Sequence, residues 1–172
     1  EHLTPGKQPT LVISACSSHT LRNWMPERYA AVADHAVNTH GMRVILAGGP
    51  SAVERDMAAA IVRHARVPLV NQVAKDTLPQ LLALLARAKV LLTPDSGPAH
   101  MATMVGTPVI GLYAASNAQR RYQILMQLHP HRVARVHSWA SDPGVLASLD
   151  SREGSRKAVV VSLEPYESPP EL

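Results

Sequence analysis

The stretch of residues 95–100, with the sequence DSGPAH, combines the residue types that bind an anion at the start of a helix. An apolar run over residues 90–93 precedes it and a helical pattern over residues 99–105 follows, which predicts a strand, a tight turn and a helix. The first backbone N–H groups of a helix lack intrahelical partners and lie at the positive end of the helix dipole. Pro98 suits the first turn because it has no N–H, and Gly97 lets a ligand approach the backbone. The stretch is therefore a candidate phosphate site.

Similar polar segments follow other apolar runs along the chain. Strands are predicted over residues 10–15, 42–47, 67–73, 90–93 and 108–113, the third being the weakest of these patterns. Polar loops follow at residues 16–23, 48–51 and 114–117, in addition to the stretch at 95–100. Ligands of parallel sheets bind outside the carboxyl ends of the strands, so we expect these loops to meet at one edge.

Helices are predicted between the strands. Pro26 begins the first and Gly41 ends it, whereas Ser51 with Glu54, and Thr77 with Gln80, have the spacing of capping boxes. Strands that alternate with helices form right-handed crossovers and a mostly parallel sheet covered on both faces. The sequence therefore predicts an α/β, Rossmann-like fold.

The C-terminal part of the chain carries weaker patterns. Residues 129–137 contain an alternating segment, residues 141–156 are predicted to be a loop, residues 157–163 a sixth strand and residues 164–172 a tail. We therefore divide the chain into a Rossmann-like domain over residues 1–137 and a C-terminal extension, partly loop or tail, over residues 138–172.

Composition narrows the classes of partner. The 172 residues include a single cysteine, Cys16, which is compatible with a reducing cytoplasm, and no signal peptide or membrane-spanning run is recognisable. The net charge of +4 is mild and Phe is absent, so nucleic acid is not an expected partner. An anionic small molecule or an anionic membrane surface fits this charge better. The histidine spacings do not suggest a metal site, and no cofactor is expected.

The motif at residues 95–102 resembles the Asp-(Thr/Ser)-Gly-x-x-His-x-(Ala/Thr) signature of the heptosyltransferase family, glycosyltransferase family 9, which builds the inner core of bacterial lipopolysaccharide. The loop of residues 17–24, followed by Pro26 and Glu27, is similar to the loop after the first strand of that family's second domain. The turn at residues 48–50 also matches in position. The resemblance covers roughly residues 10–127 and implies one half of a GT-B glycosyltransferase, the C-terminal domain that binds the nucleotide-sugar donor.

The resemblance also implies roles for particular residues. The donor's diphosphate and sugar would be lined from one side by the turn before the helix, and Arg22 with hydroxyl groups of the first loop would hold the diphosphate from the other. The implied donor-binding residues are Ser17, Ser18, Arg22, Glu54, Asp95, Ser96, Gly97, Pro98 and His100. The family's catalytic base is a carboxylate of the N-terminal domain, so no catalytic residue is expected in this chain, which by itself would bind the donor and transfer nothing.

Structural roles remain open for the same residues. Because a carboxylate repels a diphosphate, we expect Asp95 to accept bonds from backbone amides of its own turn or from sugar hydroxyls. Asp95 and Ser96 could instead only cap the helix, His100 could be packed, Arg22 could be a solvated surface residue, Glu54 could serve its capping box, and Ser17 and Ser18 could satisfy the loop backbone. Cys16 is predicted to be a small packed residue and Trp24 to anchor its loop.

The predicted function is donor binding in an inverting glycosyltransferase, an ADP-heptose:lipopolysaccharide heptosyltransferase of inner-core biosynthesis. The implied partners are ADP-heptose, the lipopolysaccharide core acceptor through an N-terminal domain, and the inner face of the bacterial inner membrane through peripheral contact. The alternatives are a GT-B-like transferase or epimerase that uses a UDP or GDP sugar, and a non-catalytic nucleotide-binding domain.

Overall fold

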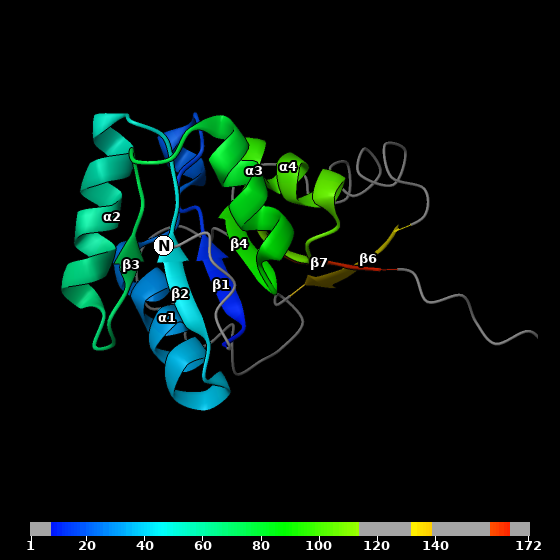
Figure 1. Ribbon diagram of the computed structural model, residues 1–172, viewed down its shortest axis with the longest axis horizontal. Coiled ribbons are helices and arrows are strands. Elements are labelled where there is room, and N and C mark those ends of the chain that lie inside the picture. Colours follow the sequence, from blue (N-terminus) through cyan, green and yellow to red (C-terminus); the bar gives the residue numbers. More distant parts are fainter. Residues whose placement is uncertain (1–7, 114–131, 139–158, 166–172) are drawn as a thin grey trace, which may run out of the picture.

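One mixed sheet forms the centre of the computed structural model, which describes residues 8–113, 132–138 and 159–165 (Figure 1). Its strand order in the described residues is β3-β2-β1-β4-β5-β7-β6. The strands are β1 (Thr10–Ile13), β2 (Arg43–Leu46), β3 (Val70–Asn71), β4 (Val90–Pro94), β5 (Val109–Tyr113), β6 (Arg132–Ser138) and β7 (Val159–Pro165). The helices are the short 3-10 helix η1 (Thr20–Arg22), α1 (Pro26–His40), α2 (Ala52–His64), α3 (Leu78–Arg87) and α4 (Gly97–Val105).

The first five strands are parallel and reverse their order next to β1. β1 pairs with β2 on one side and with β4 on the other. The chain therefore moves outward from β1 in one direction through β2 and β3, then returns to the other side through β4 and β5. In open α/β sheets the crevice at such a reversal, outside the carboxyl ends of the strands, is where ligands bind. Here that crevice lies between the loops that follow β1 and β4.

Two apolar clusters, one on each face of the sheet, hold the helices in place. Alternate residues of β1 divide between them: Val12 packs with α3 and α4, whereas Leu11 and Ile13 pack with α1 and α2. Leu85 of α3 and Tyr29 of α1 are fully buried. This burial of apolar surface on both faces is what fixes the helix starts beside the carboxyl ends of the strands.

The predicted limits of α1 and the predicted start of α3 are confirmed. α1 begins at Pro26 and ends at Gly41, whose φ of 59° is a left-handed conformation that glycine adopts without strain. Thr77 N donates to Gln80 Oε1 at 2.8 Å, as a capping box requires. α4 begins at Gly97, slightly earlier than the pattern predicts, with Pro98 in its first turn. Among the described residues, no helix is both long and apolar enough to cross a membrane.

Several strand predictions need correction. β3 has only two residues, Val70–Asn71, because it lies at the sheet edge and pairs with β2 alone among the described strands. The strand predicted over 157–163 is observed as β7, and the alternating segment before residue 138 forms β6. Both are antiparallel to their neighbours, whereas the other five strands are parallel, which agrees with the mostly parallel sheet that the sequence predicts. The predicted loops at 114–117 and 141–156 lie outside the described residues, as does most of the predicted tail.

The domain boundary at residue 137 stays a prediction. β6 (Arg132–Ser138) spans that boundary, and β7 lies beyond it in the same sheet.

Candidate functional site

An ion pair joins the two loops at the strand-order reversal. Arg22, the last residue of η1 in the loop after β1, places its Nη1 atom 3.3 Å from Oδ2 of Asp95, which follows β4. The Asp95 side chain is 8% exposed and the Arg22 side chain 25% exposed. The expectation that these loops meet is confirmed at this point. The interpretation of Arg22 as a solvated surface residue is wrong, because its guanidinium contacts a buried carboxylate.

The loop that carries Arg22 is held by hydrogen bonds within itself. Ser17 N donates to Asn23 Oδ1 at 2.8 Å, and Arg22 N donates to the His19 carbonyl at 2.9 Å. The Ser17 hydroxyl donates to the His19 carbonyl at 3.1 Å, which is the structural role considered for it from the sequence. Ser18 is exposed and lies in the same loop. The loop therefore presents Arg22 from a backbone that is already bonded.

Trp24 anchors this loop to α1, as predicted. Its ring lies 5.4 Å from the ring of Tyr29 in an edge-to-face arrangement, and the Arg28 guanidinium lies 5.7 Å from its centroid. The Tyr29 hydroxyl donates to the Ala15 carbonyl at 3.3 Å, next to the end of β1. The two Tyr29 contacts, with Trp24 and with Ala15, fix the path of the chain on either side of the Arg22 segment.

The start of α4 lies directly after Asp95. Ser96 occupies the N-cap position, but its hydroxyl lies 2.8 Å from the hydroxyl of Thr93 in β4 and makes no capping bond. Side-chain capping by Ser96 is therefore not its role here. A Cβ added to Gly97 would meet no described atom within 4 Å, so the space beside the helix start is open. Pro98 and His100 follow in the first turn, both partly exposed.

The turn of Gly48 and Gly49 after β2 is braced by Glu54. Glu54 Oε1 accepts a hydrogen bond from Gly49 N at 2.7 Å, and Oε2 accepts one from the Ser51 hydroxyl at 2.7 Å. A Cβ on Gly49 would lie 2.9 Å from Glu54 Oε2, so any larger residue at this position would displace the end of the Glu54 side chain. The predicted capping box is therefore modified: Glu54 N donates to Ser51 Oγ, but the carboxylate reaches Gly49.

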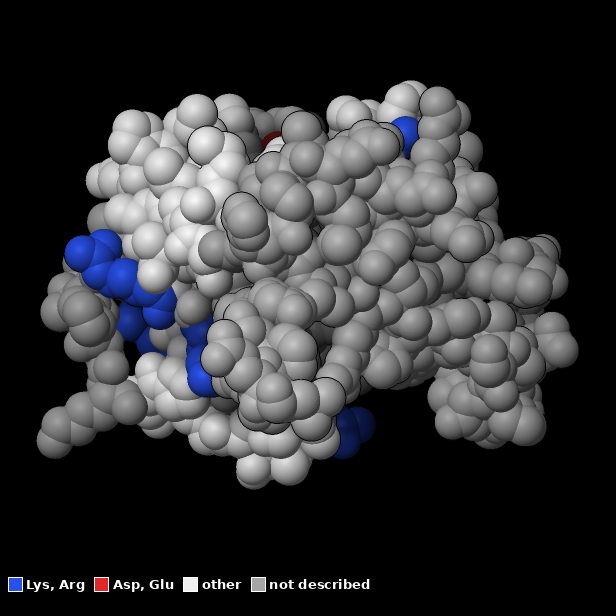
Figure 2. All heavy atoms as spheres, turned by 90° about the vertical axis from the view of Figure 1, so that its right-hand side faces the viewer, with Lys and Arg blue, Asp and Glu red and all other residues white. Residues whose placement is uncertain are grey.

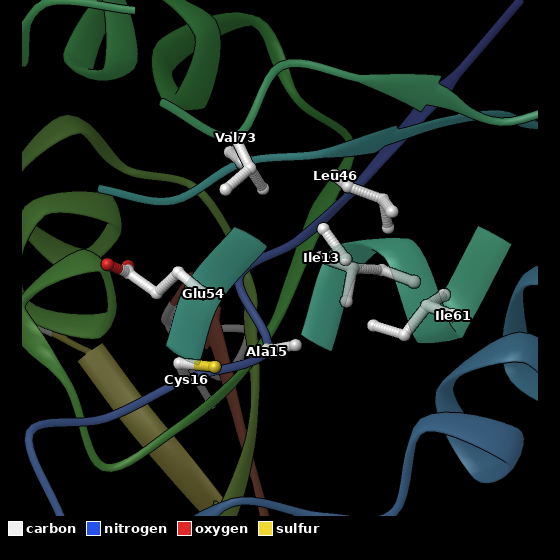
Figure 3. A pocket seen from close by; sticks show the side chains of 9 residues that line it. Ile13, Ala15, Cys16, Leu46, Glu54, Ile61 and Val73 are labelled. Carbon is white, nitrogen blue, oxygen red and sulfur yellow. The ribbon is translucent and has the colours of Figure 1, made fainter. Parts of the chain in front are cut away.

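A small pocket lies beneath this turn (Figure 3). Ile13, Leu46 and Ile61 form its apolar side, and the Glu54 carboxylate points away from them. Cys16, 8% exposed, lines the same pocket, and its Sγ donates to the Val53 carbonyl at 3.9 Å. Burial, with a smaller contribution from the Glu54 carboxylate, raises the pKa of the Cys16 thiol to about 11. Cys16 is thus packed, as predicted, and its thiol is protonated at neutral pH.

The structure brings the predicted residues together in two groups. Arg22, Asp95 and the start of α4 meet at the strand reversal, whereas Glu54 lies at the next loop, beneath which Cys16 is packed. Sequence reasoning missed the direct Arg22–Asp95 contact, although opposite charges on loops after neighbouring strands could have suggested it. It also missed the bond between Thr93 and Ser96. Within the described residues, no three His, Cys, Asp or Glu side chains gather as a metal site.

This arrangement can stabilise an oxyanion. The Arg22 guanidinium and the N-terminus of α4 both place positive charge at the carboxyl edge of the sheet. Both groups are already in position before a reaction, so no rearrangement is needed to stabilise the developing charge. Asp95 opposes them with one negative charge, but that charge already faces Arg22.

Comparisons with known proteins identify the family of this chain. Glycosyltransferase family 9 (heptosyltransferase) matches residues 1–137. The lipopolysaccharide core heptosyltransferase OpsX of Haemophilus influenzae is 43% identical over 110 residues, which cover 64% of this chain and 31% of that protein. A glycosyl transferase family 9 crystal structure from Veillonella parvula superposes with a TM-score of 0.60 at 29% identity, covering 64% of this chain and 31% of that one.

A third relative shows the fold. The Escherichia coli ADP-heptose LPS heptosyltransferase II has a TM-score of 0.60 at 23% identity, over 64% of this chain and 34% of that one. The matched region spans about a third of each of these proteins. Its structural neighbours are GT-B heptosyltransferases, so the predicted fold class is confirmed. The family match covers most of the chain, and the chain belongs to glycosyltransferase family 9, the heptosyltransferases.

Proposed function

We propose that this chain forms the donor-binding half of an inverting heptosyltransferase and binds ADP-heptose at the carboxyl ends of β1 and β4. The acceptor would be the lipopolysaccharide inner core. Membership of the heptosyltransferase family supports the reaction class, and a relative described as an ADP-heptose LPS heptosyltransferase supports the choice of donor.

The observation that carries this proposal is the position of Arg22. Its guanidinium lies at the strand-order reversal beside the start of α4, and its side chain is 25% exposed. Negative charge builds on the diphosphate as the bond to the sugar breaks. A guanidinium and a helix N-terminus facing the leaving phosphates would lower the energy of that transition state relative to the bound donor.

The other predicted residues take supporting roles in this proposal. Gly97 and Pro98 leave the first turn of α4 open to phosphate, while Ser96, His100, Ser17 and Ser18 line the same edge. Glu54 braces the Gly49 turn, and a carboxylate has further lone pairs that could accept a ribose hydroxyl. The base that activates the acceptor would come from a second domain.

Calorimetric titration of the 172-residue chain with ADP, UDP and GDP tests the donor. We expect ADP to bind most tightly, because the proposed donor is an ADP-sugar. Tighter binding of UDP or GDP would favour the alternative transferase or epimerase. Failure of all three nucleotides to bind would contradict the proposal.

We further propose a cytoplasmic location with peripheral contact at the inner membrane. Arg43, Arg87 and Lys89, here called the basic edge, lie at the amino ends of the strands: Arg43 N donates to the Pro9 carbonyl and Lys89 N to that of Thr10. Most described acidic side chains lie instead at the carboxyl edge, namely Glu27, Glu54, Asp56, Asp76 and Asp95. In Figure 2 the described Lys and Arg side chains gather mainly at mid-height and below.

Vesicle co-sedimentation tests the membrane contact. Each basic residue near an anionic surface contributes about 1 kcal/mol, so we expect binding to phosphatidylglycerol vesicles, loss of binding in high salt, and no binding to phosphatidylcholine. Replacing all three residues of the basic edge with Glu should abolish it. The control is to replace Arg55 and Lys75, which are exposed near the opposite edge of the sheet, with Glu. This control should reduce vesicle binding less. Equal losses would contradict a specific role of the basic edge.

A further inference from the structure

Asp95 presents a problem that the proposed function does not solve, because a carboxylate beside a diphosphate site should weaken anion binding. Its side chain is 8% exposed and its Oδ2 atom faces Arg22 Nη1 at 3.3 Å. A buried carboxylate is retained at a cost unless a cation or hydrogen-bond donors compensate it. The contact with Arg22 is therefore part of what compensates the burial of this carboxylate.

The two partners are buried unequally. Three quarters of the Arg22 side chain is covered, but the remaining 25% faces solvent, whereas Asp95 is almost wholly enclosed. A guanidinium carries five N–H donors in a rigid planar fork. One nitrogen can therefore stay on Asp95 while another N–H of the same guanidinium binds a second anion.

An exchange, in which Arg22 leaves Asp95 to bind phosphate, is less favourable than this shared arrangement. Exchange would remove the guanidinium from a carboxylate that water barely reaches, and that loss costs free energy which the shared arrangement avoids. The loop also resists movement, since Ser17 N is bonded to Asn23 and Asn23 N to the Thr20 carbonyl at 3.0 Å. Arg22 is thus held from both ends, by its backbone and by Asp95.

We propose that Asp95 is a positioning residue, which holds the Arg22 guanidinium in the orientation that binds the donor's diphosphate and stays paired with it in the complex. This inference rests on the proposed function. It assigns Asp95 an action through Arg22 rather than a contact with the donor. On this view, the donor affinity gained by holding the Arg22 guanidinium in place exceeds the affinity lost to repulsion between the Asp95 carboxylate and the phosphates.

The sign of the effect of Asp95→Asn on ADP binding distinguishes positioning from simple repulsion. If Asp95 only repelled the phosphates, removing its charge would tighten binding. If Asp95 positions Arg22, the weaker neutral hydrogen bond leaves the guanidinium mobile and binding loosens. We expect ADP affinity to fall on the order of tenfold, within the range of couplings between contacting residues.

A double-mutant cycle isolates the pair. ADP binding is measured by calorimetry for the wild type, Asp95→Asn, Arg22→Ala and the double variant. With Ala at position 22 there is no guanidinium to position, so the Asp95→Asn change should leave affinity unchanged or raise it slightly. Equal weakening in both backgrounds would mean that Asp95 touches the ligand itself, and no weakening in either would leave only repulsion. Both outcomes overturn the inference.

Two further measurements keep the test decisive. Arg22→Lys retains the charge but has no fork, so it cannot serve Asp95 and phosphate at once and should bind ADP more weakly than the wild type. Wild-type affinity in this variant would overturn the shared arrangement even if Asp95→Asn fails to fold. If the wild type binds no ADP, the proposed function fails. The positioning role is then tested without ligand, by NMR relaxation of the Arg22 Nε–H group. This group should be more mobile in Asp95→Asn than in the wild type. Equal mobility in the two proteins would refute the positioning role.

Discussion

Leu85→Ala should lower the free energy of unfolding by about 2–5 kcal/mol, the range for removing a buried leucine side chain from a packed core. Leu85 is 0% exposed and belongs to the cluster that joins α3 and α4 to the sheet. Its carbonyl also accepts a hydrogen bond from the Thr107 hydroxyl at 2.5 Å, beside the turn that ends α4. Loss of the side chain would leave a cavity directly behind the helix whose start forms the candidate site.

The control lies on the same helix. Leu78, the first residue of α3, is 69% exposed, so Leu78→Ala should change the unfolding free energy by about 0.5 kcal/mol or less. Urea denaturation followed by circular dichroism measures both changes. The slope of the unfolding free energy against urea concentration should be the same in all variants if only stability changes. Equal losses for the two variants would contradict the placement of α3 against the sheet.

Helix limits were predictable because their signals are local. Pro26 and Gly41 act through their own backbone conformations, and Thr77 and Gln80 bond to each other within a single turn. Strand length was less predictable. β3 is limited to Val70–Asn71 by its pairing with β2, and nothing in the apolar pattern of residues 67–73 says how far a neighbouring strand extends.

Pairing direction was also beyond local reasoning. The alternation before residue 138 and the apolar run near residue 160 indicate strands, but both directions of pairing accept such residues. Direction depends on the path of the chain between strands, which the strand residues do not encode. The antiparallel addition of β7 to β5 therefore became visible only in the structure.

The location of the candidate site was predictable from the sequence, but the contacts within it were not. The rule that ligands bind at the carboxyl edge of a parallel sheet is enough to predict that the two loops lie close together. The contact between Arg22 and Asp95 depends on how η1 turns and on how deeply Asp95 is buried, and both follow from tertiary packing. Ser96 illustrates the same limit, since its type predicts a cap but the nearby Thr93 hydroxyl takes its bond.

Arg22→Ala should weaken ADP binding by about 1.5–3 kcal/mol, the contribution of a hydrogen bond to a charged group. This corresponds to roughly 10- to 150-fold in the dissociation constant. The variant also removes the guanidinium that faces the 8% exposed Asp95 carboxylate, so the free energy of unfolding should fall as well. Calorimetric titration well below the melting temperature separates the two effects, because the folded fraction is then close to one.

Arg28→Ala is the matched control. Arg28 is a neighbouring arginine with its guanidinium 5.7 Å from the Trp24 ring, so its loss removes the same charge from the same region without touching the Asp95 contact. If ADP were attracted only by the overall electrostatic field of this region, both variants would lose similar affinity for ADP. That loss would become smaller in high salt. A loss confined to Arg22→Ala, and retained in salt, requires a direct contact with phosphate, because a contact in a partly buried site is screened much less than a field that acts through solvent.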